Sequence, residues 1–258
     1  MSALRSLILW VLVVSITAAF CIALLPWAML GRRRFVFRLA RVWATTLLAV
    51  SGIQVVVENS ERLLPAPDSK QIAGAIQLAN HQSFLDVVAF CYALPGPLSY
   101  MAKSSLFRIP IFGQVLKGLG TIPVDRSKRA SSGRAMGAAV RAIKAGQRVM
   151  IFPEGTRSRA DGSLMPFKRG AFVLARDSAV PVQSLTVSGA GSIMPAGQKG
   201  VWIQRIYRGT IRIVVHPVMA PEEIAQLDAV ELSDRIYRLI DRPLDRLGVL
   251  AEIETVRF

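Results

Sequence analysis

An uncharged apolar run near the N-terminus constrains this chain more than any other feature. Ser6 to Leu30 form 25 consecutive residues without a charged side chain. As a helix this run would be roughly 37 Å long, enough to cross a hydrocarbon core of about 30 Å. A cleaved signal peptide is the main alternative, but its apolar region is typically about 7–15 residues long. Because this run is longer and ends in three consecutive arginines, we expect a retained membrane anchor over about residues 6–30.

Arginines on both sides of the run predict its orientation. Arg5 precedes it, and Arg32, Arg33, Arg34, Arg38 and Arg41 follow it. By the positive-inside rule, everything beyond the run lies in the cytoplasm. Arg34, Arg38 and Arg41 share one helical face, which suits anionic lipid headgroups. We therefore expect an inner (cytoplasmic) membrane protein with its main domain on the cytoplasmic face.

A second apolar stretch, Val42 to Val57, is short for a membrane span. It predicts an interfacial or domain-packed helix over about 33–57. The expected organisation is an N-terminal membrane anchor over 1–57 and a second domain over 58–258. The joint between them is expected near Leu64–Ser69, which contains two prolines.

The remainder alternates short apolar runs with helical patterns. Residues 75–79, 148–152, 180–187 and 211–215 are typical of strands. Residues 133–145 have the spacing of an amphipathic helix, and Pro221-Glu222-Glu223 is typical of a helix start. This alternation predicts an α/β fold, with a mixed sheet flanked by helices and preceded by the N-terminal membrane-associated helical segment.

Composition narrows the class of protein. The net charge is +15 and the pI about 11, yet 52% of the residues are hydrophobic, which excludes a disordered polycation. Two cysteines exclude a disulfide scaffold. Residues 99–176 contain fifteen basic residues and three acidic ones. This segment is either a solvated basic surface or a surface that attracts anionic ligands such as phosphates.

One of the two histidines stands in a pattern that suggests catalysis. His81 follows the predicted strand 75–79, and Asp86 lies five residues further on. If Ser83 caps a helix, Asp86 falls in its first turn and can reach back to His81. A histidine held by a carboxylate is the arrangement of an oriented general base. The Ser83…Asp86 spacing also fits a purely structural capping box. No serine or cysteine nearby is a convincing nucleophile, and Cys91 is expected to be a core thiol, so the activated hydroxyl would be the substrate's own.

Two further polar segments follow predicted strands. Phe152 to Ser158 (FPEGTRS) places a carboxylate, a glycine and an arginine together, and Gly120 to Arg126 is a short strand that ends in Asp-Arg. Arg126 and Arg157 have the planar guanidinium that binds phosphate in a bidentate manner. The glycine-rich stretch 189–200 lacks the P-loop pattern and is expected to be a surface loop.

Together these segments resemble the glycerolipid acyltransferase family, in particular its 1-acyl-sn-glycerol-3-phosphate acyltransferases. The resemblance rests on NHQSFLD at residues 80–86, on the strand ending at Arg126, and on FPEGTRS at residues 152–158. The segment from Lys103 to Gly113 also fits. The family's proline-rich fourth block departs here, since Pro181 is present but Ser184 stands where a second proline is usual.

The resemblance implies roles for individual residues. His81 would be the catalytic base, and Asp86 would orient it. The substrate-binding residues would be Lys103, Arg126, Glu154, Gly155, Thr156 and Arg157, with Pro181 on the acyl side. Neither a metal nor another cofactor is implied, and the chain has no cluster of His and Cys ligands.

The reaction implied is transfer of a fatty acyl group to the sn-2 hydroxyl of 1-acyl-sn-glycerol-3-phosphate (lysophosphatidic acid), which forms phosphatidic acid in phospholipid biosynthesis. The donor would be acyl-CoA or acyl-acyl-carrier-protein, and membrane lipids would be further partners. One alternative is a related acyltransferase that acts on another lysolipid, such as a lyso-aminolipid. Another is a non-enzymatic basic membrane protein that binds anionic lipid or nucleic acid. No zinc finger or aromatic-interleaved basic patch supports nucleic-acid binding.

Overall fold

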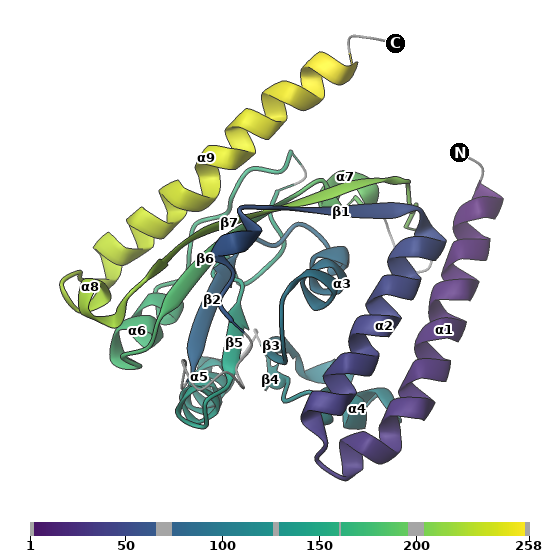
Figure 1. The fold of residues 1–258 in the computed structure, drawn as a ribbon, viewed down its shortest axis with the longest axis horizontal. Helices are drawn as coiled ribbons and strands as arrows, with labels where there is room; N and C mark the ends of the chain where they lie inside the picture. Colours follow the sequence, from purple (N-terminus) through teal and green to yellow (C-terminus); the bar gives the residue numbers. More distant parts are fainter. Residues whose placement is uncertain (1–2, 66–73, 126–128, 160, 196–203, 256–258) are drawn as a thin grey trace.

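A computed structural model describes residues 3–65, 74–125, 129–159, 161–195 and 204–255. The chain begins with two antiparallel helices, α1 (Ala3–Met29) and α2 (Arg33–Ser51), which form a hairpin (Figure 1). Gly52, at φ +68°, then ends α2 in the left-handed conformation. The following β-branched residues form β1 (Ile53–Glu58). The helix predicted to continue to residue 57 therefore ends at Ser51.

Seven strands of the described chain form one sheet in the order β1-β7-β6-β2-β5-β3-β4. The strands after β1 are β2 (Ala75–Ala79), β3 (Leu98–Lys103), β4 (Ile122–Val124), β5 (Arg148–Ile151), β6 (Val182–Ser188) and β7 (Gly209–Met219). Neighbouring strands are parallel except β6 and β7, which are antiparallel. The mixed α/β sheet and the four strands predicted from apolar runs are confirmed.

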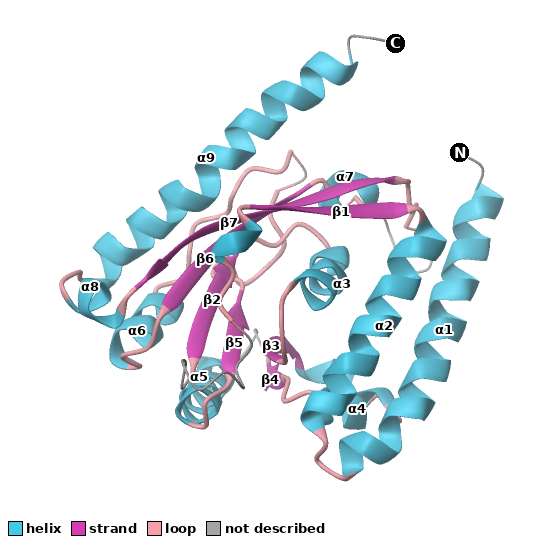
Figure 2. Ribbon diagram, in the orientation of Figure 1, coloured by secondary structure: helices cyan, strands magenta, loops and turns pink. Residues whose placement is uncertain are grey.

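Helices cover both faces of the sheet (Figure 2). The α1–α2 hairpin, α3 (Phe84–Ala93) and α4 (Phe112–Gly118) lie on one side. The other side holds α5 (Arg129–Lys144), α6 (Gly170–Asp177), α8 (Pro221–Ala225) and α9 (Ala229–Thr255). Shorter turns are η1 (Ser60–Arg62), η2 (Ser104–Arg108) and α7 (Ala190–Ile193).

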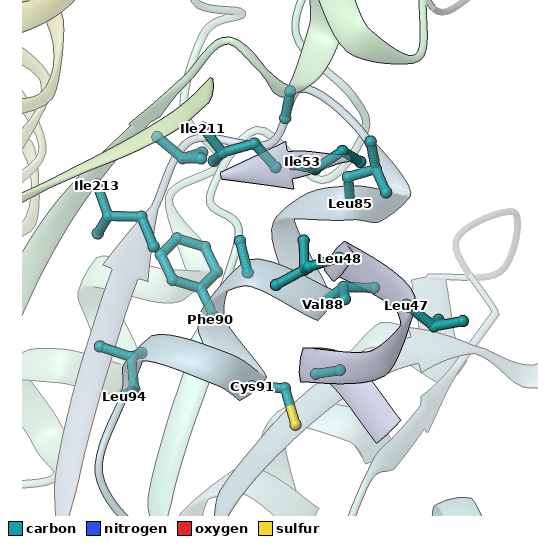
Figure 3. Packing of buried hydrophobic residues seen from close by; sticks show 14 of the residues in the cluster. Leu47, Leu48, Ile53, Leu85, Val88, Phe90, Cys91, Leu94, Ile211 and Ile213 are labelled. Atoms are coloured by element: carbon teal, nitrogen blue, oxygen red, sulfur yellow. The ribbon is translucent and has the colours of Figure 1, made fainter. Parts of the chain in front are cut away.

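The core on the hairpin side is built in layers around α3. Leu48 of α2 and Val88 and Phe90 of α3 belong to one buried cluster, together with Ile211 and Ile213 of β7 (Figure 3). Helix α3 is therefore enclosed between α2 and the sheet. All five residues of β2 are buried, as expected for a strand covered on both faces.

The N-terminal hairpin packs against the rest of the chain and does not stand apart from it. The Trp10 indole N–H donates to the carbonyl of Gln204 at 2.8 Å. Arg33 donates to the carbonyl of Leu119 at 3.0 Å and to the hydroxyl of Ser99 at 2.7 Å. One of the arginines predicted to follow a membrane span is thus directed into the protein. The predicted boundary at residue 57 runs through β1, which pairs with β7 along its length.

Among the described residues, one helical segment, Arg5–Met29, is long and apolar enough to cross a membrane by length and composition. Two expected loops lie partly outside those residues. The joint at 64–69 is described only to residue 65, and Leu64 is buried there. The stretch 189–200 is described to residue 195 and includes α7, whose Ala190 and Ile193 are buried, so this part is not a simple surface loop.

Candidate active site

The polar motifs meet because the strands before them are parallel. Leu78 of β2 pairs with Ile151 of β5, and Lys103 of β3 pairs with Val124 of β4. The segments that follow these strands therefore all start at the carboxyl ends of the strands, on the same side of the sheet. There the 80–86 segment and the 152–158 turn contact each other directly.

His81 and Asp86 form a close pair. The His81 Nδ1 atom lies 2.8 Å from Asp86 Oδ2. The Asp86 side chain is fully buried, and that of His81 is 13% exposed. The imidazole also stacks on Phe152, with ring centroids 4.2 Å apart. With Nδ1–H donated to the carboxylate, Nε2 is the ring atom able to accept a substrate proton.

The same carboxylate caps helix α3. Asp86 Oδ2 accepts hydrogen bonds from the backbone N–H groups of Gln82, at 2.6 Å, and Ser83, at 2.8 Å. The Ser83 hydroxyl accepts from the N–H of Leu85 at 3.4 Å. The capping and catalytic interpretations of this spacing are therefore compatible, because the same carboxylate contacts both the helix start and the His81 ring. The two backbone donors also hold the carboxylate in the position from which it contacts the imidazole.

Glu154 holds the two motifs together. Its Oε1 accepts from the N–H of His81 at 2.8 Å and from the Ser158 hydroxyl at 2.9 Å, and its Oε2 accepts from the N–H of Met165 at 2.9 Å. Burial raises the pKa of this carboxyl above its ordinary value, and these hydrogen bonds oppose the rise. The Ser158 N–H in turn donates to the carbonyl of His81. Glu154 therefore positions the His81 segment, with both oxygens occupied by protein donors.

Several predicted binding residues gather at one cavity. Lys103, Thr156 and Arg157 line it beside His81. Gly155 stands just before Thr156, at φ +67°, where a side chain would be strained. Arg126 lies outside the described residues.

Pro181 is placed away from this group. Its carbonyl accepts from the N–H of Ile76, at the opposite end of β2. Ile76 precedes His81 by five residues, or about 16 Å of extended strand. Pro181 is not among the residues that line the cavity.

The cavity itself has a volume of about 880 Å³ and is mostly apolar. Its walls include Phe20, Cys21 and Leu24 of α1 and Phe37, Ala40 and Trp43 of α2. It continues between α3 and β3 as far as Leu98, which pairs with Arg148 at the start of β5. The apolar space thus extends from His81 toward the far end of the sheet, a shape suited to a long hydrocarbon chain.

The cysteines belong to the cavity wall. Burial raises the pKa of the Cys91 thiol to about 12, so the nucleophilic thiolate is disfavoured there, as expected for a core thiol. Within the part of the chain that the structure describes, no group of three or more His, Cys, Asp or Glu side chains could hold a metal ion.

Sequence reasoning missed three features of this site. The first is the contribution of α1 and α2 to the cavity, which a run interpreted as an anchor does not reveal. The second is the stacking of Phe152 on His81. The third is Lys168, whose side chain lies over Gly155 although it is distant in sequence. The basic stretch Lys168-Arg169 was a signal, but nothing in the sequence placed it here.

The fold and the site define an α/β protein of the acyltransferase class, with a histidine–aspartate pair at the mouth of an apolar cavity. The chain belongs to the acyltransferase family, whose model matches residues 54–188.

Curated relatives support this membership. The chain is 33% identical over 185 residues to a chloroplastic 1-acyl-sn-glycerol-3-phosphate acyltransferase of Brassica napus, covering 72% of this chain and 50% of that protein. It is 31% identical over 181 residues to the 1-acyl-sn-glycerol-3-phosphate acyltransferase of Salmonella typhimurium, covering 70% and 71%. The chain thus spans about half the length of the chloroplast relatives that it matches.

The crystal structure of the 1-acyl-sn-glycerophosphate (LPA) acyltransferase PlsC from Thermotoga maritima has the same fold. Its TM-score is 0.79 at 24% identity, and the match covers 96% of this chain and 98% of that one.

Proposed function

We propose that this protein transfers a fatty acyl group from a thioester donor to the sn-2 hydroxyl of 1-acyl-sn-glycerol-3-phosphate, and so forms phosphatidic acid. The observation that carries the proposal is the His81–Asp86 pair at the mouth of an apolar cavity. The names of the relatives support the choice of acceptor. The donor would be acyl-CoA or acyl-acyl-carrier-protein, both of which present a long chain on a thioester.

The geometry supports a direct transfer. His81 Nε2 removes the proton of the acceptor hydroxyl while that oxygen adds to the thioester carbonyl carbon. The tetrahedral intermediate then collapses, the C–S bond breaks, and the departing sulfur takes the proton from His81. Asp86 stabilises the imidazolium that exists between these two transfers.

The cations at the cavity mouth support a phosphate-bearing acceptor. Lys103 and Arg157 line the cavity together with His81 and one acidic residue, Asp125, whereas most of its other lining residues are apolar. A phosphate is costly to bury in an apolar space. We therefore assign the acceptor phosphate to the mouth, with Thr156 and Gly155 in the turn beside it, and the donor's acyl chain to the interior.

The hairpin supports a protein bound to one side of a membrane. Leu7, Val11 and Val14 of α1 are exposed, while Leu9 and Leu24 of the same helix are buried against the protein. Because α2 runs antiparallel to α1, the chain returns to the side where it began. This favours attachment to one face of the membrane over a crossing anchor. We assign that face to the cytoplasmic side of an inner membrane, where anionic headgroups would attract the N-terminal arginines.

The test is an assay of purified protein with lysophosphatidic acid and each donor, beside a panel of other lysolipids. We expect His81→Ala to lower kcat/KM by about 10²–10⁴-fold, the range for loss of a general base. Lys144→Ala, at an exposed site on α5, is the control. Near-wild-type turnover by His81→Ala would refute the base assignment. Preference for another lysolipid, such as a lyso-aminolipid, would replace the proposed acceptor.

A further inference from the structure

The segment after the FPEGTRS turn folds back onto it. The Met165 N–H donates to the Glu154 carboxylate at 2.9 Å, and the Lys168 N–H donates to the carbonyl of Pro153 at 2.8 Å. These two bonds fix the backbone on both sides of residues 166 and 167. Lys168 is thus anchored beside the turn although it lies ten residues after Ser158.

The Lys168 side chain lies directly over Gly155. A Cβ atom at Gly155 would lie 2.6 Å from Lys168 Nζ and 2.7 Å from its Cε. The glycine therefore meets two requirements, a φ of +67° and space for the lysine stem. Thr156 and Arg157, which follow Gly155, line the cavity. The ammonium group is thus held beside a turn that carries two cavity-lining residues, although Lys168 itself does not line the cavity.

No protein group neutralises this ammonium among the described residues. The ion pairs there do not include Lys168, Arg157 or Lys103. The carboxylate of the same motif, Glu154, is buried and receives hydrogen bonds from neutral donors instead. Asp125 also lines the cavity, but none of the ion pairs among the described residues joins it to these three cations. Cations without counter-charges at the mouth of a cavity attract an anionic ligand, and a lysine ammonium is a common phosphate partner.

We propose that Lys168 binds a substrate phosphate next to the cavity, beside the turn that carries Arg157. This inference rests on the proposed function. Two substrates carry a phosphate: the lysophosphatidic acid acceptor, and the donor through its CoA or phosphopantetheine group. In both cases the lysine would bind a phosphate group, and kinetic measurements show whether that phosphate belongs to the donor or to the acceptor.

The experiment compares Lys168→Ala and Lys168→Arg with Lys144→Ala, which removes an exposed lysine from α5. Donor and acceptor concentrations are varied separately. For Lys168→Ala we expect the KM of one substrate to rise about tenfold, in line with loss of one charged hydrogen bond, with kcat nearly unchanged. Lys168→Arg should recover most of this loss because it keeps the charge. The substrate whose KM rises identifies the phosphate.

The inference is overturned if Lys168→Ala matches Lys144→Ala for both substrates, or if it lowers kcat without changing either KM. A binding measurement separates this result from failure of the proposed function. In a His81→Ala background, lysophosphatidic acid is compared with monoacylglycerol, and CoA with pantetheine. Weaker binding of only a phosphorylated ligand by Lys168→Ala supports the inference even if wild-type protein does not turn over lysophosphatidic acid. The inference is refuted if the phosphorylated ligands bind equally well to the proteins with Lys168 and with Lys168→Ala.

Discussion

The two histidines of the chain have different surroundings. His81 is partly open at the cavity, whereas His216 on β7 is 7% exposed and lies 2.8 Å from the Thr186 hydroxyl. Thr186 donates its single proton to the carbonyl of Ile240 in α9, at 3.0 Å. His216 Nε2 must therefore donate to Thr186, which defines the neutral tautomer. Burial lowers the pKa of His216 to about 4.

This depressed pKa predicts a pH-dependent loss of stability. The stabilisation from neutral His216 is complete above the unfolded-state pKa of about 6.5 and is lost as pH falls toward 4, by about 3 kcal/mol in total. We expect His216→Gln, which keeps a donor for Thr186, to remove this part of the pH dependence. Urea unfolding at pH values from 7 to 4 measures it. Lys144→Ala, at an exposed site on α5, is the control and should retain the wild-type slope. The prediction would be contradicted if the free energies of unfolding of the wild type and of His216→Gln differed by the same amount at every pH.

At single positions, the sequence identified residues whose chemistry depends on local spacing. His81 and Asp86 are five residues apart, and a strand followed by a capped helix is enough to bring them together. The role of Glu154 as a positioning residue was not predictable, because its three partners lie in separate segments. Lys168 was missed for the same reason, since only the folded return segment places it over Gly155.

Among the secondary-structure elements, the α1–α2 hairpin departs furthest from expectation. Apolar length predicted α1, but it could not reveal that one helical face packs on the protein while the other is exposed. Similarly, the stretch 42–57 has no charged residue and is mostly apolar throughout, so only Gly52 marks the change from helix to strand. Strands β2, β5, β6 and β7 were predicted because runs buried in a sheet are mostly apolar, whereas β1 was expected to be helical and β3 was not predicted.

Arg33 provides a test of how the hairpin is held. Its two side-chain hydrogen bonds reach Leu119 and Ser99, outside the hairpin. We expect Arg33→Ala to lower the free energy of unfolding by about 1–3 kcal/mol, because the half-buried Leu119 carbonyl and the buried Ser99 hydroxyl lose a charged donor. Arg34→Ala, at the exposed neighbouring position, should change it by less than about 0.5 kcal/mol. Chemical denaturation of both variants measures the difference, and equal effects would show that these bonds do not secure the hairpin.

For the whole molecule, the proposed function assigns membrane contact and substrate binding to the same two helices. Val11 and Val14 are 58% and 41% exposed on α1, away from the cavity, and exposed Arg38 and Arg41 lie on the neighbouring α2. Ala40, by contrast, is 4% exposed and lines the cavity. The positive charge of the chain thus has two locations, one beside an apolar surface and one at the cavity mouth. An acyl chain could then pass between bilayer and site along one hairpin.

Because different faces of the hairpin are assigned to the membrane and to the cavity, we expect mutations to affect membrane binding and turnover separately. The double variant Val11→Glu and Val14→Glu should bind vesicles of anionic phospholipid several-fold more weakly, because it places charge on an apolar surface, while its turnover in detergent stays near wild type. Ala40→Leu should bind the vesicles normally but turn over long-chain donors more slowly than short-chain donors, since the added atoms occupy the cavity. Co-sedimentation and a donor chain-length series measure the two effects. If the surface variant loses turnover in detergent, or the cavity variant loses vesicle binding, the two faces of the hairpin do not act independently.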